Sequence, residues 1–141
     1  MRYWDASALA PLVVNEERTE EVRSWLAEDA MIVTWAWTRV ELASAVERRV
    51  REGRFTRPMR RQVLDRFEAL WESWDEVTDV LAVRAKAMAV IARHPLRAAD
   101  AAQLGAALAI GEQMPEGLAF ACLDHRLNEA AEREGLRVLW L

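Results

Sequence analysis

The sequence predicts a single α/β domain with a mostly parallel sheet that helices cover on both faces. Short apolar segments alternate with helical segments along the chain, and strands that are joined through helices lie parallel. The segment Leu118–Leu123 is apolar throughout, which is typical of a strand covered on both faces. The 141 residues, of which 52% are hydrophobic, suffice for one domain with a sizeable core, so residues 1–141 are expected to form one unit.

Five segments are expected to be strands, because each is short and bounded by a helical segment or a turn, and all but Val77–Val80 are mainly apolar. They are Arg2–Trp4, Met31–Val33, Val77–Val80, Leu118–Leu123 and Arg137–Leu141.

Six segments are expected to be helices, because apolar residues recur at helical spacing and capping residues mark their ends. They are Asn15–Asp29, Thr38–Glu52, Thr56–Trp74, Ala82–Arg93, His94–Gly111 and His125–Glu134. The second and third of these are joined by a short basic link. The sequence therefore predicts a helical hairpin at about residues 38–74.

One carboxylate interrupts the apolar face of the helix expected at His94–Gly111. Asp100 precedes Leu104 by four residues and Leu108 by eight, so it lies on the apolar stripe. A carboxylate on a buried face needs a partner, because an unpaired buried charge is costly. The partner could be the N–H groups at the start of the helix, or a metal ion that other acids share.

Two further acids directly follow expected strands. Asp5 comes after Arg2–Trp4, and Asp124 comes after Leu118–Leu123. In parallel sheets the functional crevice lies beyond the carboxyl ends of strands, where the strand order reverses. If these two strands are neighbours, the two carboxylates meet in that crevice.

Together with Glu41 these acids form a set of four, and each has a structural alternative. Asp5 could be a turn residue, Glu41 could close a capping box with Thr38, and Asp124 could cap the last helix. Asp100 could answer the helix dipole. All four nevertheless fall at strand ends or in first helical turns, which share one edge of the sheet. This common position favours a shared site.

An oxygen-only ligand set indicates which ion such a site would bind. Clustered carboxylates suit Mg²⁺ or Mn²⁺ better than zinc, and His94 and His125 lack the spacing of paired metal ligands. A bound divalent ion polarises a phosphoryl oxygen and activates water. Phosphodiester hydrolysis is therefore the chemistry that these residues predict.

Four stretches of the chain resemble the signature stretches of PIN-domain ribonucleases, most closely the toxins of VapBC-type toxin–antitoxin pairs. They are Trp4–Leu9, Thr38–Ala45, Leu96–Leu108 and Leu123–Leu136. The resemblance implies a three-layer α/β/α fold with a five-stranded parallel sheet. It also implies Mg²⁺- or Mn²⁺-dependent endoribonuclease activity and a cognate antitoxin.

The resemblance also implies roles for individual residues. The catalytic and metal-binding acids of the family fall on Asp5, Glu41, Asp100 and Asp124, and its small hydroxyl residue falls on Ser7. Asn128 is near a position where some members add a further polar group. Two alternatives remain: a PIN-like nuclease that processes RNA or cuts DNA without an antitoxin, and a degenerate PIN domain that only binds. The presence of all four acids argues against the degenerate domain.

Arginines are concentrated at the tip of the expected hairpin, although the net charge of −4 excludes a global basic field. They could be a solvated helical tip, a surface that contacts RNA phosphates, or a contact for an antitoxin or a second copy. The seven arginines are Arg48, Arg49, Arg51, Arg54, Arg57, Arg60 and Arg61.

The remaining expectations concern location and association. The single cysteine, Cys122, is expected to be an inert core residue, and its isolation fits a reducing cytoplasm. No segment has the length of a membrane span, and the first residues do not resemble a signal peptide. Trp35 and Trp37 could stack on bases, but packing is the expected role. A homodimer is expected, because Trp-rich helices would otherwise leave much apolar surface bare.

Overall fold

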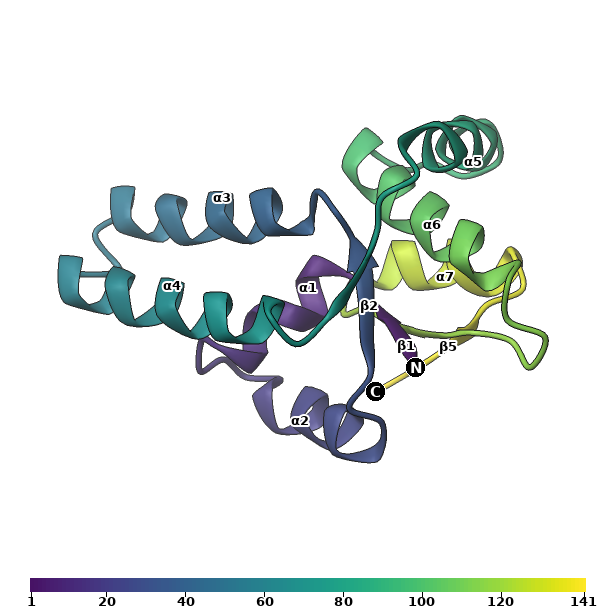
Figure 1. Cartoon of the computed structure of the whole chain (residues 1–141). Coiled ribbons are helices and arrows are strands. Elements are labelled where there is room, and N and C mark those ends of the chain that lie inside the picture. Colours follow the sequence, from purple (N-terminus) through teal and green to yellow (C-terminus); the bar gives the residue numbers. More distant parts are fainter.

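The computed structural model describes residues 1–141 as three layers, with one sheet between two groups of helices (Figure 1). All neighbouring strands pair in parallel, in the order β3-β2-β1-β4-β5. The predicted α/β fold class is therefore confirmed. The strands are β1 (Arg2–Trp4), β2 (Ile32–Trp35), β3 (Asp75–Val77), β4 (Ala119–Ala121) and β5 (Arg137–Val138).

Helices cover both faces of this sheet. One face carries α5, α6 and α7, and the other carries α1, α2 and the hairpin of α3 and α4 (Figure 1). The helices are α1 (Ala6–Leu9), α2 (Thr19–Glu28), α3 (Thr38–Arg51), α4 (Arg57–Trp71), α5 (Val80–Arg93), α6 (Ala98–Gly111) and α7 (His125–Arg133), with a 3₁₀ turn, η1, at Ala10–Leu12. No helix is long and apolar enough to cross a membrane.

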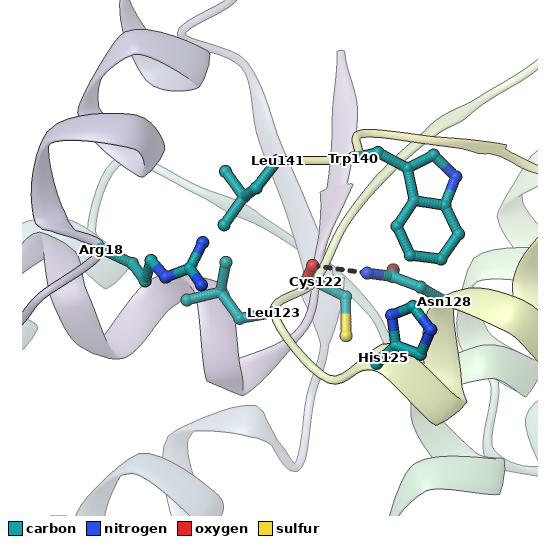
Figure 2. Close-up of a pocket in the computed structure, with 7 residues that line it drawn as sticks. All are labelled: Arg18, Cys122, Leu123, His125, Asn128, Trp140 and Leu141. Carbon is teal, nitrogen blue, oxygen red and sulfur yellow. Dashed lines mark hydrogen bonds between the residues drawn. The ribbon is translucent and has the colours of Figure 1, made fainter.

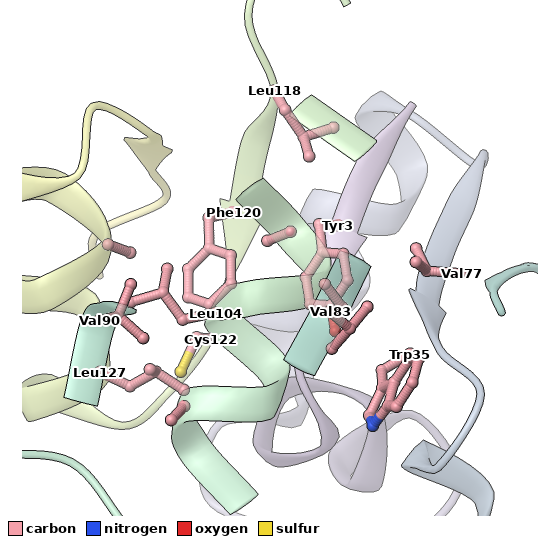
Figure 3. Close-up of a cluster of buried hydrophobic side chains, with 14 of the residues drawn as sticks. Tyr3, Trp35, Val77, Val83, Val90, Leu104, Leu118, Phe120, Cys122 and Leu127 are labelled. Atoms are coloured by element: carbon pink, nitrogen blue, oxygen red, sulfur yellow. The ribbon is translucent and has the colours of Figure 1, made fainter. Parts of the chain in front are cut away.

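Two hydrophobic clusters, one on each face, follow from the alternation of side chains along the strands. Tyr3 and Phe120 stack with ring centroids 5.6 Å apart in the cluster beneath α5, α6 and α7 (Figure 3). The next residues along the same strands, Trp4 and Ala121, point to the opposite face and pack with α1 to α4. Burial on both faces explains why β4 is apolar throughout.

The strand order reverses at β1, which lies between β2 and β4. The sequence predicted a functional crevice where the strands that precede Asp5 and Asp124 are neighbours, and β1 and β4 do pair in parallel. The backbone N–H of Asp5 donates to the carbonyl of Ala121 at 2.9 Å, which extends this pairing by one residue. The carboxyl ends of β1 and β4 thus form the switch point of the sheet.

The helix expected at His94–Gly111 begins four residues later, at Ala98. Pro95 disfavours a helical conformation for the residue before it, and His94 is accordingly extended, with φ −132° and ψ 146°. His94 is buried, and its Nε2 lies 3.1 Å from Glu134 Oε2. The position of Asp100 in the first turn of the helix survives this correction.

Other element boundaries also differ from the sequence expectation. The helix expected from Asn15 starts at Thr19, whose hydroxyl accepts a hydrogen bond from the N–H of Glu16 at 2.8 Å. Helix α4 ends at Trp71, not at Trp74, and β2 continues to Trp35. The short helices after Asp5 were not predicted. The strand expected at Val77–Val80 is misplaced: β3 is Asp75–Val77 and α5 already begins at Val80, because Asp79 caps that helix by accepting from the N–H of Ala82 at 3.0 Å. The strands β4 and β5 end before the expected Leu123 and Leu141.

Helices α5 and α6 approach each other closely at Gly105. A Cβ atom at this position would lie 2.9 Å from both Ala87 N and Val83 O, which are backbone atoms of α5. Backbone atoms cannot move aside as a side chain can, so the helix pair requires glycine here. This contact fixes α6, which carries Asp100, against α5.

Replacement of Gly105 by alanine is expected to lower the free energy of unfolding by about 1–3 kcal/mol, the usual range for overpacking a core. Gly111→Ala on the same helix is the matched control, because a Cβ there meets only side chains at 3.7 Å or more. The control should be neutral or stabilising by up to about 1 kcal/mol, since alanine favours helix. Urea unfolding of both variants measures the difference. Equal effects of the two substitutions would contradict the close-contact explanation.

Candidate active site

Asp5 lies at the carboxyl end of β1 and caps the N-terminus of α1. Its Oδ2 accepts hydrogen bonds from the backbone N–H and the hydroxyl of Ser7, at 3.1 and 2.6 Å. The thiol of Cys122 lies 3.4 Å from the same oxygen. Asp5 is 5% exposed, and this burial raises the pKa of its carboxyl, which the hydrogen bonds from Ser7 partly oppose.

Glu41 projects from the first turn of α3 and is partly buried. Its Oε1 accepts a hydrogen bond from Gln103 Nε2 at 3.0 Å. Burial raises the pKa of Glu41 to about 7, and the negative charges of Asp5 and Asp100 act in the same direction. The expected capping box is wrong: Trp37 occupies the cap without a side-chain hydrogen bond, and the hydroxyl of Thr38 turns inward.

Asp100 and Asp124 face a common cavity of about 460 Å³, which Arg97 and Arg126 also line. Burial raises the pKa of Asp100, the charges of Asp124 and Asp5 raise it further, and Arg97 opposes them. Asp124 is exposed and caps α7, because its Oδ1 accepts from the N–H of Leu127 at 3.0 Å. The structural alternative for Asp124 is thus confirmed, and it leaves the second carboxylate oxygen uncommitted.

The four acids therefore come from four different elements and meet in one electrostatic environment. Asp5, Glu41 and Asp124 each commit one oxygen to hydrogen bonds within the protein and retain a second. No three acidic, cysteine or histidine side chains already enclose a point at metal-binding distances. The donor set consists of oxygen atoms, and the charges of neighbouring acids add to burial in raising the pKa of Glu41 and of Asp100, so these residues fit a hard divalent cation.

Ser7 and Asn128 take different positions relative to the acids. Ser7 contacts Asp5 directly and also accepts a hydrogen bond from the N–H of Leu123 at 2.9 Å, which joins α1 to the end of β4. Asn128 is buried and donates from Nδ2 to the carbonyl of Cys122 at 2.9 Å, and its Oδ1 has no partner. Figure 2 shows Asn128 in a neighbouring cavity of about 340 Å³, between Trp140 and His125. Its side chain makes no hydrogen bond to any of the four acids, although its backbone N–H donates to the carbonyl of Asp124 at 2.9 Å.

The seven arginines concentrated at the tip of the hairpin fall into two groups. Arg49, Arg54 and Arg60 form ion pairs with Glu16, Glu52 and Glu47 respectively. The others form no ion pair, which leaves their guanidinium groups available to a ligand. They are Arg48, Arg51, Arg57 and Arg61.

Arg48 is the hairpin arginine nearest to the acids. It lines a groove of about 460 Å³ together with Ser7 and Glu41. Arg57 and Arg61 are exposed in the first turns of α4, at the tip of the hairpin (Figure 1). Unpaired arginines thus lie both beside Glu41 and at the tip of the hairpin.

The other residues singled out in the sequence take structural positions. Trp35 is buried in the core, and Trp37 is exposed. The ring of His125 packs against Trp140 at a tilt of 58°, and its Nε2 lies 3.2 Å from Glu129 Oε1 at the surface. Cys122 is buried, and burial raises the pKa of its thiol far above the ordinary value, so it does not ionise at neutral pH. Its contact with Asp5 nevertheless makes it part of the wall of the site.

Sequence reasoning missed Gln103, Arg97 and Arg126. The signal for Gln103 was available, because it is the only polar side chain in α6 after Asp100 and follows that acid by three residues. Residues at this spacing share a helix face. Arg97 and Arg126 carried no comparable signal, since arginine is abundant in the chain.

Comparisons with known proteins agree with this geometry. The sequence model of the PIN domain family matches residues 2–133. Ribonuclease VapC47 of Mycobacterium tuberculosis (strain CDC 1551 / Oshkosh) is 33% identical over 96% of this chain and 93% of its own length. Ribonuclease VapC35 of the same strain is 32% identical over 99% of this chain and 96% of its own length. With its four acids at the switch point of a five-stranded parallel sheet, the chain belongs to the PIN-domain family and is of the VapC type.

Proposed function

We propose that the protein is a Mg²⁺- or Mn²⁺-dependent endoribonuclease that acts as the toxin of a toxin–antitoxin pair. The observation that carries this proposal is the gathering of Asp5, Glu41, Asp100 and Asp124 at the switch point of the sheet. Both relatives described above are named ribonucleases, which supports RNA as the substrate. Retention of all four acids disfavours a PIN domain that only binds.

The four acids would hold the cation between the ends of β1 and β4 and the first turns of α3 and α6. A bound divalent ion supplies polarisation of a phosphoryl oxygen and activation of a water molecule. Glu41 has a pKa of about 7 in the protein alone, so it carries a proton in part of the molecules at neutral pH. Binding of a cation would favour the ionised form of Glu41 and displace this proton.

Other side chains would bind and orient the RNA. Arg97 and Arg126 line the cavity beside Asp100 and Asp124, where they can pair with phosphates next to the scissile bond. Arg48 borders the groove beside Glu41. These positive charges offset the repulsion between an acidic crevice and the RNA backbone.

The protein would bind two protein partners, an antitoxin and a second copy of the chain. Helix α5 exposes Leu81, Met88 and Ile91, and the start of α3 exposes Trp37 and Val40. Large apolar side chains at these positions support association, because a small monomer seldom leaves so many uncovered.

Cleavage of total cellular RNA tests the proposed activity. Protein stripped of metal should cleave RNA when Mg²⁺ or Mn²⁺ is added, should be inactive with excess chelator, and should not be restored by zinc. Asp100→Asn should abolish nearly all cleavage, because it replaces one negatively charged carboxylate of the ligand set with a neutral amide. Mapping of the RNA ends identifies the scissile bonds. Full cleavage by the stripped parent in excess chelator would contradict the mechanism.

The unpaired arginines at the hairpin tip should act on RNA binding and not on the chemical step. Arg57→Glu/Arg61→Glu is expected to raise KM and to leave single-turnover cleavage at saturating RNA largely unchanged. Loss of two phosphate contacts should reduce the slope of log affinity against log salt by about 1.4. The measurement is RNA binding between low and moderate salt.

A charge-matched control for this variant is Arg84→Glu/Arg133→Glu, in which both arginines are exposed, form no ion pair and lie on α5 and α7. The control should keep the parent salt slope. If the hairpin variant also keeps the parent salt slope, Arg57 and Arg61 belong to a solvated helical tip and do not contact RNA phosphates.

A further inference from the structure

A buried hydrogen-bond network lies directly behind Glu41 and has Gln103 at its centre. Gln103 is fully buried in α6, surrounded by apolar residues such as Leu104 and Ala107. Its Oε1 accepts a hydrogen bond from the hydroxyl of Tyr3 at 2.6 Å. Its Nε2 donates to Thr38 Oγ1 at 2.9 Å and to Glu41 Oε1 at 3.0 Å.

The available protons fix the direction of every hydrogen bond in this network. Thr34 donates its one hydroxyl proton to the carbonyl of Trp4 at 2.7 Å, so Thr38 must donate to Thr34 across their 2.8 Å contact. Thr38 can then only accept from Gln103. A flipped Gln103 amide would present an oxygen to both Thr38 and Glu41, which have no proton to give it when Glu41 is ionised. With Glu41 ionised, as a cation ligand must be, the amide therefore has one orientation, in which both of its protons are used.

This geometry joins the elements that carry three of the four acids. Gln103 follows Asp100 by three residues on α6, it binds Glu41 and Thr38 on α3, and it binds Tyr3 two residues before Asp5. A buried polar side chain destabilises a core unless all its hydrogen bonds are made. Here they are all made, and Glu41 is the only ionisable carboxyl among the partners of Gln103.

We propose that Gln103 is a positioning residue that holds the carboxylate of Glu41 in the orientation needed to bind the divalent cation. The inference rests on the proposed function, because it takes Glu41 as a ligand. Glu41 keeps its second oxygen free while Gln103 holds the first, so the amide restricts rotation of the carboxylate without occupying the ligand position.

Two variants and one control test this role. Gln103→Met keeps the length and burial of the side chain and removes both N–H donors. Thr38→Val has nearly the same shape as the parent residue and removes one acceptor that orients the amide. Leu104→Val is the control, since Leu104 is the next residue on α6, equally buried and without polar contacts. Circular dichroism and melting curves establish that each variant folds.

The measurements are Mn²⁺ affinity of the RNA-free protein by calorimetry, and kcat and KM for RNA cleavage. Gln103→Met should weaken Mn²⁺ binding and lower kcat by about 10–100-fold, the usual effect of removing a partner of a metal ligand, with KM for RNA unchanged. Thr38→Val should show a smaller loss in the same direction. Leu104→Val should lower the melting temperature and keep the parent Mn²⁺ affinity.

The possible results separate the two levels of inference. A parent protein that neither binds Mn²⁺ nor cleaves RNA overturns the proposed function, and the role of Gln103 with it. A parent that does both, with folded Gln103→Met at parent affinity, overturns only the role of Gln103. If Gln103→Met does not fold, a folded Thr38→Val variant that binds Mn²⁺ with the parent affinity likewise overturns only the role of Gln103. Equal losses of affinity in Leu104→Val would make the effect one of general stability.

Discussion

Mutual repulsion of four carboxylates at one edge of the sheet is the constraint on which the rest of the structure depends. Charges of like sign at a partly wet site repel by about 1 kcal/mol per pair. Burial is the main cause of the raised pKa of Glu41 and of Asp100, and the repulsion from neighbouring acids raises both further. The scaffold opposes it with N–H and O–H donors, which Ser7, Gln103 and the start of α7 supply to one oxygen of each of three acids. A bound divalent cation would offset the repulsion that these hydrogen bonds leave.

The parallel sheet is what allows acids so distant in sequence to meet. Each strand ends at the same edge, and the order β3-β2-β1-β4-β5 makes β1 and β4 neighbours although more than a hundred residues separate them. Because both faces are buried, the strands cannot slide without moving side chains such as Tyr3 and Phe120 out of the core. The close approach of α6 to α5 at Gly105 fixes Asp100 in the same way.

Much of this arrangement could be predicted from the sequence, because it follows from periodic patterns. The alternation of strands and helices and the position of Asp5 and Asp124 directly after strands were predicted in this way and are present. That these two strands are neighbours was only a condition of the shared site, and the pairing of β1 with β4 meets it. The start of α6 was not predicted correctly. The extended conformation of His94 depends on Pro95 and also on a contact with Glu134, which is distant in sequence. The capping box at Thr38 failed for a similar reason: its hydroxyl has a better partner in Thr34, which no local pattern reveals.

The most direct test of the account is the melting temperature of the parent and of Asp100→Asn, each measured with chelator and with Mg²⁺. If the acids repel one another and share an ion, the metal-free variant is as stable as the parent or more so, because one charge is gone. Mg²⁺ then raises the melting temperature of the parent far more than that of the variant, since an ion stabilises the folded state by binding to it. The account would be contradicted if the metal-free variant were less stable than the parent and if Mg²⁺ stabilised variant and parent equally. Asp100 would then only interact favourably with the dipole of α6.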